Sequence, residues 1–454
     1  MRRTIVLSAV AGMITLGGFV PRAHALPSYA RQTGLPCTGC HTAPPELNAA
    51  GREFKLLGYV NRAANRDLIS AASSQRYAPM NLLQVLPLGA WFETSLASTK
   101  AAQPGTQDGN FEFPQDVSLF LAGAWGDHLG SFLQVTYDAQ ADHFGMDNTD
   151  IRYANTTKVG GKELVYGITL NNNPTLEDLW NDTPAWGYPF IASDSAPTPA
   201  AAPVINGLLA EDVAGIGGYT MWNQHLYGDV TVYRSDHIGS SQPTNGQGAS
   251  YNIRGVAPYW RAAWQQVGAK YDLEVGAYGM HVASTPGAVT GPEDTYTDFG
   301  PDLQYDLTIH RKDTLTVRGT FIHETSSLAA TVAANAAANP GGVAEPIDHK
   351  LNSGNANVEY HFGDRYSGAF GMFDTSGTGD PYLYPQAAIS GSANGSPRSA
   401  GYIANLSYWP LQNVDLAVQY TGYTRFNGGS TNYDGAGRNA SDNNTVYLLA
   451  RFIF

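Results

Sequence analysis

From about Pro87 to the end of the chain, segments of about ten residues alternate apolar and polar side chains. Leu416–Tyr420 and Thr445–Phe454 are two clear examples, and turn-rich stretches separate such segments. Alternation with a period of two is typical of a β-strand that has one apolar and one polar face. Gly160-Gly161 and Gly363-Asp364 lie between neighbouring segments and favour tight hairpin turns. The pattern therefore predicts an all-β fold built from antiparallel strands.

The number of segments and the lengths of their connections predict a membrane barrel. We count roughly 16 strands, and outer-membrane barrels have an even number of strands, short periplasmic turns and longer outer loops. The long loops of this chain are Gln103–Asn110, Asn172–Asp212, Ser235–Ile253, Ala329–His349, Thr375–Pro397 and Asn427–Asn443. We therefore expect a transmembrane outer-membrane β-barrel of about 16 antiparallel strands over residues 86–454. A soluble propeller is the alternative, but no fixed repeat period is visible.

The composition agrees with a barrel and excludes several other classes of protein. Only 14% of the residues are charged, while 50 are Gly and 26 are Tyr, which argues against a helical enzyme and against disorder. The net charge of -13 argues against nucleic acid as a partner. Tryptophans near the ends of predicted strands fit the aromatic girdles of a membrane protein: Trp91, Trp125, Trp222, Trp260, Trp264 and Trp409.

The first 25 residues have the pattern of a signal peptide. Arg2 and Arg3 precede the apolar stretch Ile5–Val20, and Ala23-His24-Ala25 is an A-x-A cleavage site. We expect the mature chain to begin at Leu26 and to reach the cell envelope. An uncleaved membrane anchor is the alternative, and the cleavage site argues against it.

The sequence Cys37-Thr38-Gly39-Cys40-His41 is a C-x-x-C-H motif, the attachment signature of haem c. Two thiols add to the vinyl groups of one porphyrin, and the histidine that follows becomes the proximal iron ligand. The alternatives are a redox-active C-x-x-C and half of a zinc site. A zinc site would need His or carboxylate partners, because these are the only two cysteines of the chain. We therefore predict one covalent haem c held by Cys37, Cys40 and His41.

Residues 26–60 are expected to form a small monohaem cytochrome c segment, and residues 61–85 a linker to the barrel. Pro44-Pro45 is expected to start a helix whose apolar face, formed by Leu47, Ala50, Phe54 and Leu57, packs on the porphyrin. Domains below about 40 residues seldom bury enough apolar surface to be stable alone. A barrel of about 16 strands encloses an aqueous lumen. We therefore expect the helical haem segment to plug the periplasmic half of the lumen.

The N-terminal segment resembles the fused cytochrome–porin family, whose best-known members are outer-membrane iron oxidases of iron-oxidising bacteria. The matching stretches are Tyr29–Gly34, Pro45–Asn48, Gly51-Arg52, Phe54-Lys55, Gly58-Tyr59, Asn172–Thr175 and Pro184–Pro189. The chain also ends on an aromatic residue in an amphipathic strand, which resembles the terminal signal of bacterial outer-membrane proteins. The resemblance is close over the haem segment and covers the barrel by architecture.

The resemblance implies an oxidoreductase of the Fe(II):cytochrome c type. Electrons from Fe(II) at the cell surface would pass through the haem at Cys37, Cys40 and His41 to a periplasmic carrier, a cytochrome or a copper protein. The family also has members whose donor is not iron. Two other readings stay open: a diffusion porin with a structural haem plug, and a periplasmic electron carrier with an all-β binding domain.

The motif does not name the distal haem ligand. Met80 follows the haem helix and is the first candidate, because a Met ligand raises the haem potential. Met280 is predicted to face the lumen and is the second candidate. Histidine is the other option for this ligand, with His281 and His323 as candidates, but their strand parity is opposite to that of nearby charged residues.

Oxygen ligands and histidine suit an entry site for Fe(II). Two groups of such residues fall in presumed outer loops. The first is Asp142, His143, Asp147 and Asp150; the second is Glu177, Asp178 and Asp182, beside Trp180 and Trp186. The alternative for both groups is that they are solvated loop charges.

Overall fold

The computed structural model describes residues 28–42, 46–60, 87–107, 109–181, 191–236, 251–286, 290–310 and 313–454. Within these ranges, 17 strands form one antiparallel sheet. Sixteen are long: β1 (Leu88–Thr99), β3 (Asp116–Ala124), β4 (Leu129–Asp138), β5 (His143–Val159), β6 (Lys162–Asn171), β7 (Val213–Trp222), β8 (Leu226–Ser235), β9 (Ala257–Val267), β10 (Tyr271–Ser284), β11 (Asp294–Thr308), β12 (Thr314–Ser327), β13 (Asp348–Phe362), β14 (Tyr366–Gly377), β15 (Ser399–Leu411), β16 (Val414–Arg425) and β17 (Thr445–Ile453). The remaining strand, β2 (Asn110–Glu112), has three residues and pairs with β1.

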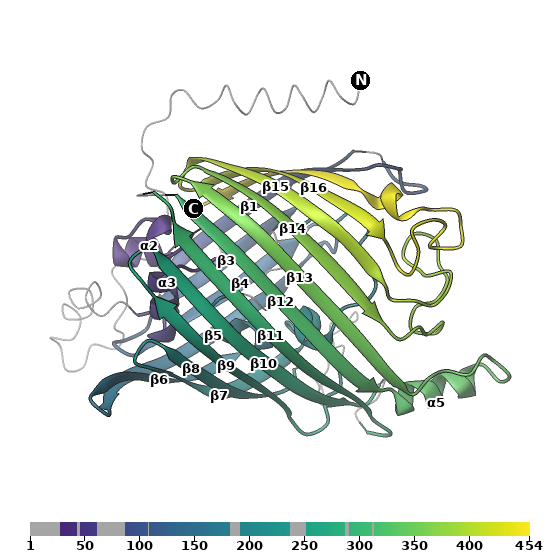
Figure 1. The fold of residues 1–454 in the computed structure, drawn as a ribbon, viewed down its shortest axis with the longest axis horizontal. Coiled ribbons are helices and arrows are strands. Elements are labelled where there is room, and N and C mark those ends of the chain that lie inside the picture. Colours follow the sequence, from purple (N-terminus) through teal and green to yellow (C-terminus); the bar gives the residue numbers. More distant parts are fainter. Residues whose placement is uncertain are drawn as a thin grey trace.

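The sheet closes on itself through its first strand (Figure 1). Trp91 of β1 lies opposite Ile453 of β17 on one side and opposite Ser118 of β3 on the other. Closure leaves no row of unpaired backbone groups at a sheet edge. The predicted barrel of about 16 antiparallel strands is confirmed.

Alternate residues of each strand face opposite sides of the barrel wall, and β11 shows the pattern clearly. Asp298, Asp302 and Gln304 are buried on the inner side, while Phe299 and Leu303 between them are exposed on the outer side. Polar side chains inside and apolar side chains outside are the arrangement of a barrel whose outer surface contacts lipid. No helix in the described part of the chain is long and apolar enough to cross a membrane.

The two ends of the barrel differ as the sequence predicts. One end has short turns such as Gly160-Gly161 between β5 and β6, and the C-terminal end of β17 lies there (Figure 1). The other end has the long loops, including the Ala-rich run, which forms α5 (Ala329–Ala338). The connection between β4 and β5 is an exception, because β5 already begins at His143. The expected outer loop around Asp142–Asp150 is therefore wrong, and most of those residues lie on a strand.

The N-terminal segment, which we define as described residues 28–42 and 46–60, contacts the inner wall at the short-turn end (Figure 1). It contains α2 (Ser28–Thr33), the 3-10 turn η2 (Cys37–Gly39) and α3 (Ala49–Leu56). The Gln32 Nε2 donates to the carbonyl oxygen of Ala122 at 2.9 Å, and the Tyr219 hydroxyl donates to that of Leu56 at 2.9 Å. The segment therefore has polar anchors on at least two strands of the wall.

The helix α3 begins later than predicted. Residues 43–45 lie outside the described ranges, and Leu47 pairs with His41 in an isolated antiparallel bridge, which keeps this stretch extended. The Asn48 side chain then accepts a hydrogen bond from the Gly51 N–H at 3.0 Å and caps the helix. The helix ends at Leu56, and Gly58 follows as the expected stop signal with a φ of 72°, a left-handed conformation that favours glycine.

The longest connection lies between β6 and β7, and its described residues, 172–181 and 191–212, turn into the lumen instead of remaining outside; we call these residues the long loop. It contains η3 (Pro174–Glu177) and the π-turn η4 (Val204–Leu208). Gln115 Nε2 donates to the carbonyl oxygen of Ala192 at 3.2 Å, while the backbone N–H of Ile205 donates to Asp298 Oδ2 at 2.7 Å. Gln115 and Asp298 belong to distant parts of the wall, so the long loop spans the interior of the barrel.

Candidate functional site

The C-x-x-C-H motif folds into a tight turn at the mouth of an apolar cavity. The backbone N–H of His41 donates to the carbonyl oxygen of Cys37 at 2.9 Å, which places both cysteines and the histidine on one side of the turn. All three line the cavity, which we call the Cys37 cavity. Apolar residues from the N-terminal segment and from the barrel complete its wall: Leu35, Leu47, Phe54, Trp91, Phe120, Phe132, Leu176 and Ile453.

The atoms around the motif are compatible with an attached haem. His41 Nδ1 lies 3.1 Å from the carbonyl oxygen of Glu46, so Nδ1 carries the proton and Nε2 carries the lone pair that an iron ligand needs. A Cβ at Gly51 would lie 2.1 Å from the carbonyl oxygen of Cys40, so only glycine lets α3 approach the motif so closely. The two cysteines form no disulfide and are half-buried. The two thiols, the Nε2 atom of His41 and the apolar wall of the cavity therefore fit haem c.

The alternatives to haem fit the cavity less well. Burial raises the pKa of the Cys37 thiol to about 11 and raises that of Cys40 as well, whereas a redox-active C-x-x-C requires a lowered pKa. Among the described residues, neither cysteine belongs to a group of three or more side chains spaced to hold a metal ion.

Residues of α3 and of the stretch just before it line the Cys37 cavity. Leu47 and Phe54 line the cavity as predicted, but Gly51 and Lys55 do so in place of Ala50 and Leu57. The Lys55 side chain is buried, and its Nζ lies 3.4 Å from the carbonyl oxygen of Asp178 in the long loop. Burial lowers the pKa of Lys55 to about 8.

The candidates for the distal haem ligand lie in different places in the structure. Met80 lies outside the described residues. Met280 faces the lumen as predicted, but it is buried in an apolar cluster with Val204 and Tyr259 and does not line the Cys37 cavity. His281 is exposed on the outer side, and His323 Nδ1 is 2.7 Å from Asn352 Oδ1. Neither histidine lines the cavity, so these three candidates are wrong for the conformation described here.

Several proposed iron ligands belong to a buried ionic cluster instead. Arg152 of β5 contacts Asp150 at 2.7 Å and Glu177 of the long loop at 2.9 Å, and all three side chains are fully buried. Asp150 also accepts a hydrogen bond of 2.5 Å from the hydroxyl of Tyr59. One guanidinium therefore joins the barrel wall, the long loop and the N-terminal segment, which we call the Arg152 cluster.

The other residues of the two predicted groups of Fe(II) ligands lie in different parts of the protein. Asp178 pairs with Arg261 at 3.2 Å, and Asp142 is exposed and accepts from the Tyr137 hydroxyl at 2.6 Å. Trp180 is buried with the guanidinium groups of Arg52 and Arg261 near its ring. Asp182 and Trp186 lie outside the described residues. The expectation that Asp150, Glu177 and Asp178 are iron ligands or solvated loop charges is therefore wrong.

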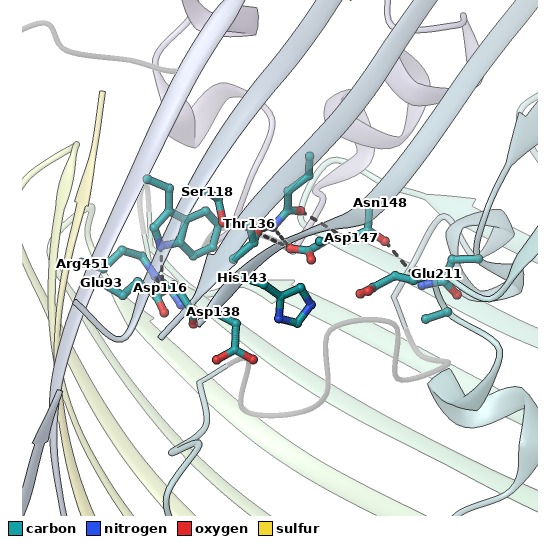
Figure 2. Close-up of a pocket in the computed structure, with 15 residues that line it drawn as sticks. Glu93, Asp116, Ser118, Thr136, Asp138, His143, Asp147, Asn148, Glu211 and Arg451 are labelled. Carbon is teal, nitrogen blue, oxygen red and sulfur yellow. Dashed lines mark hydrogen bonds and ion pairs between the residues drawn. The ribbon is translucent and has the colours of Figure 1, made fainter. Parts of the chain in front are cut away.

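His143 and Asp147 do come together, in a second pocket inside the barrel that we call the acidic pocket (Figure 2). Its wall also contains Glu93, Asp116, Asp138 and Glu211. Carboxylate oxygens of Asp116, Asp138 and Asp194 lie within 4.8 Å of one another. Sequence reasoning missed these three because Asp116 and Asp138 become neighbours only through the register of the β3–β4 pairing, and Asp194 joins them only through the inward turn of the long loop.

The acidic pocket is expected to respond to pH through two carboxyls of the long loop, Glu211 in its wall and Asp194 beside Asp116 and Asp138. Burial, and then the neighbouring acidic groups, raise the pKa of Asp194 and of Glu211 to about 7. Both groups lose a proton as the pH rises through this value, so the pocket gains negative charge. We expect the preference of reconstituted barrels for cations over anions to increase between about pH 6 and about pH 8. Reversal potentials in a salt gradient measure this preference, and a variant with Asp194→Asn and Glu211→Gln should respond much less; an unchanged or inverted response in the unmodified protein would contradict the expectation.

No family model and no curated protein matches this chain. Solved structures of outer-membrane proteins are similar at a low level. In vitro folded OmpT of Vibrio cholerae is 10% identical with a TM-score of 0.42, covering 81% of this chain and 96% of its own. The channel DcaP of Acinetobacter baumannii is 11% identical with a TM-score of 0.45, covering 81% and 96%. OmpF of Salmonella typhi in complex with daunomycin is 10% identical with a TM-score of 0.42, covering 81% and 97%. No residue role can be transferred at these values, and the porin-like barrel rests on the strand pairings of the chain itself.

Proposed function

We propose that the protein is an outer-membrane electron conduit that accepts electrons from an external donor, Fe(II), and passes them through one covalent haem c to a periplasmic carrier. The observation that carries the proposal is the position of Cys37, Cys40 and His41 in an apolar cavity between the N-terminal segment and the barrel wall. When bound, haem c supplies a centre that takes up and releases one electron. Cys37 and Cys40 would attach it, His41 would bind its iron, and the apolar residues of the Cys37 cavity would contact the porphyrin.

Three groups of contacts keep the N-terminal segment inside the barrel. Glu46, whose carbonyl oxygen orients His41, forms a buried ion pair with Arg318 of β12. Arg52 of α3 pairs with Asp272 of β10. Tyr59 reaches the Arg152 cluster through Asp150. These contacts reach widely separated strands, which supports the view that the haem segment is a plug of the short-turn end.

The acidic pocket supports Fe(II) as the donor. A lumen lined by carboxylates raises the local concentration of cations. His143 and Asp147 supply the mixed nitrogen and oxygen groups that suit Fe(II). Tight binding is not required, because the product Fe(III) must leave after it has lost its electron. A cytochrome–porin that uses another donor would retain the Cys37 cavity but would not need these carboxylates.

The test is to isolate outer membranes that contain the protein and to add Fe(II) without oxygen. We expect the haem absorption band to change rapidly to that of the reduced form, because Fe(II) gives up one electron as it becomes Fe(III). Dithionite serves as a control for total reducible haem. Haem that dithionite reduces and Fe(II) does not would refute Fe(II) as the donor.

A diffusion porin with a structural haem plug is the second candidate, since the chain forms a porin-like barrel. The inward contacts of the N-terminal segment and of the long loop argue for a narrow lumen. Swelling of liposomes in sugar solutions separates the two proposals. Little swelling together with rapid haem reduction supports the conduit, whereas fast swelling without reduction supports the porin.

A further inference from the structure

The acidic pocket and the Cys37 cavity meet at one side chain. Among the described residues that line the two spaces, Trp91 of β1 is the one that lines both. The sequence predicts Trp91 in an aromatic girdle at the membrane surface, and that expectation is wrong. Its strand parity is that of the buried Glu93, Ser95 and Ala97, so its indole faces the interior.

The indole of Trp91 is fixed on several sides. Its Nε1 donates a hydrogen bond of 2.6 Å to Glu93 Oε1, and the same carboxylate oxygen accepts from Arg451 Nε at 2.5 Å. The Arg451 guanidinium lies 4.2 Å from the centroid of the indole ring. Phe120 stacks with the indole at a centroid distance of 5.9 Å and lines the Cys37 cavity itself. A side chain held in this way keeps a constant position between the two spaces.

The chemistry of the position favours electron transfer through the ring. The rate of electron transfer falls steeply with distance, and an aromatic ring between donor and acceptor couples them better than a gap or an aliphatic chain. The Arg451 guanidinium over the ring face and the Glu93 carboxylate at Nε1 form an ion pair, so their opposite charges offset each other at the indole. The position of the ring between the two spaces therefore suits it as a bridge that the electron crosses.

We propose that Trp91 is the bridging residue between an Fe(II) ion in the acidic pocket and the haem in the Cys37 cavity. In the transfer, one electron leaves Fe(II), which becomes Fe(III), and reduces the haem iron from Fe(III) to Fe(II); no bond forms or breaks and no proton moves. This inference rests on the proposed function, and it adds a route from the lumen to the haem.

The test compares haem reduction by two reagents in the full-length protein. Fe(II) is a cation that the acidic pocket attracts, whereas dithionite is an anion that the pocket repels, so the two reagents do not share the pocket. The variants are Trp91→Met, which fills much of the space without a ring, and Trp91→Phe, which keeps a smaller ring. Trp264→Leu, on the exposed face of β9, is the matched control.

We expect Trp91→Met to slow the reduction of haem by Fe(II) by roughly tenfold or more, which corresponds to a barrier about 1.4 kcal/mol higher, and Trp91→Phe to slow it by roughly threefold. The rate with dithionite should fall much less in both variants, because dithionite does not share the acidic pocket. Trp264→Leu should be reduced by Fe(II) as fast as the unmodified protein.

The outcomes separate the inference from the function on which it rests. If Fe(II) does not reduce the haem of the unmodified protein, the proposed donor is wrong. If it does, a wild-type rate in either Trp91 variant would overturn the bridging role. An equal loss of rate with Fe(II) and dithionite would also overturn it, because the loss would then arise at the haem site, whose wall Trp91 lines. If Trp91→Met fails to assemble, Trp91→Phe decides alone.

Discussion

Replacing both Cys37 and Cys40 by alanine is expected to remove all haem that stays attached to the chain on a denaturing gel. The two thiols are the only cysteines of the chain, so no other thioether can replace them. Haem-dependent peroxidase staining of the gel measures the attached haem, and absorption spectra of outer membranes measure the total. The double variant should also lose the spectral change that Fe(II) produces.

One further variant and one check of assembly complete this experiment. Thr38→Ala changes the same turn without removing a thiol and should retain its haem. The strand pairings that close the barrel involve β1, β3 and β17 and none of the motif residues, so the double variant should still assemble in the outer membrane. Haem staining in the double variant would refute covalent attachment at this motif.

The second large effect is expected at Arg152. Arg152→Met leaves the carboxylates of Asp150 and Glu177 buried without their cation, and breaking a buried ion pair in this way costs about 3–5 kcal/mol. The same change removes one of several contacts that join the long loop to the wall; those of Gln115, Asp298 and Arg261 remain. We expect a lower unfolding temperature in detergent, measured by circular dichroism, and faster swelling of liposomes because the part of the long loop around Glu177 loses its ion pair with the wall.

The matched control is Arg398→Met, which removes an arginine that pairs with Asp374 at 3.4 Å on the surface, where both side chains are about half exposed. Exposed pairs contribute about 0–1 kcal/mol, so this variant should unfold like the unmodified protein. Equal unfolding temperatures for the two variants would show that the Arg152 cluster does not hold the interior together.

Much of the barrel could be predicted because strand alternation is a local property. The segments Leu416–Tyr420 and Thr445–Phe454 lie in β16 and β17, and the turn at Gly160-Gly161 lies where a hairpin was expected. The start of α3 could not be predicted in the same way. Its cap at Asn48 depends on the pairing of Leu47 with His41, and that contact forms only when the motif folds.

The residues of the candidate site also differ in how well the sequence predicts their role. The motif Cys37–His41 is contiguous, and its chemistry follows from its spacing. The charged residues near it were harder to assign, because a carboxylate in a loop has the same sequence signal whether it faces solvent or an arginine. The sequence predicts Glu177 and Asp178 as outer-loop charges, whereas they lie buried against Arg152 and Arg261.

By itself, the sequence of this protein determines a long antiparallel barrel and contains a short C-x-x-C-H motif that predicts haem attachment, because strand periodicity and motif spacing are each encoded in neighbouring residues. Only the tertiary structure decided what lies inside the barrel. The inward turn of the long loop, the acidic pocket and the place of Trp91 between two spaces all require residues that are far apart in the chain. Such contacts form only when β1 pairs with both β3 and β17 and the barrel closes.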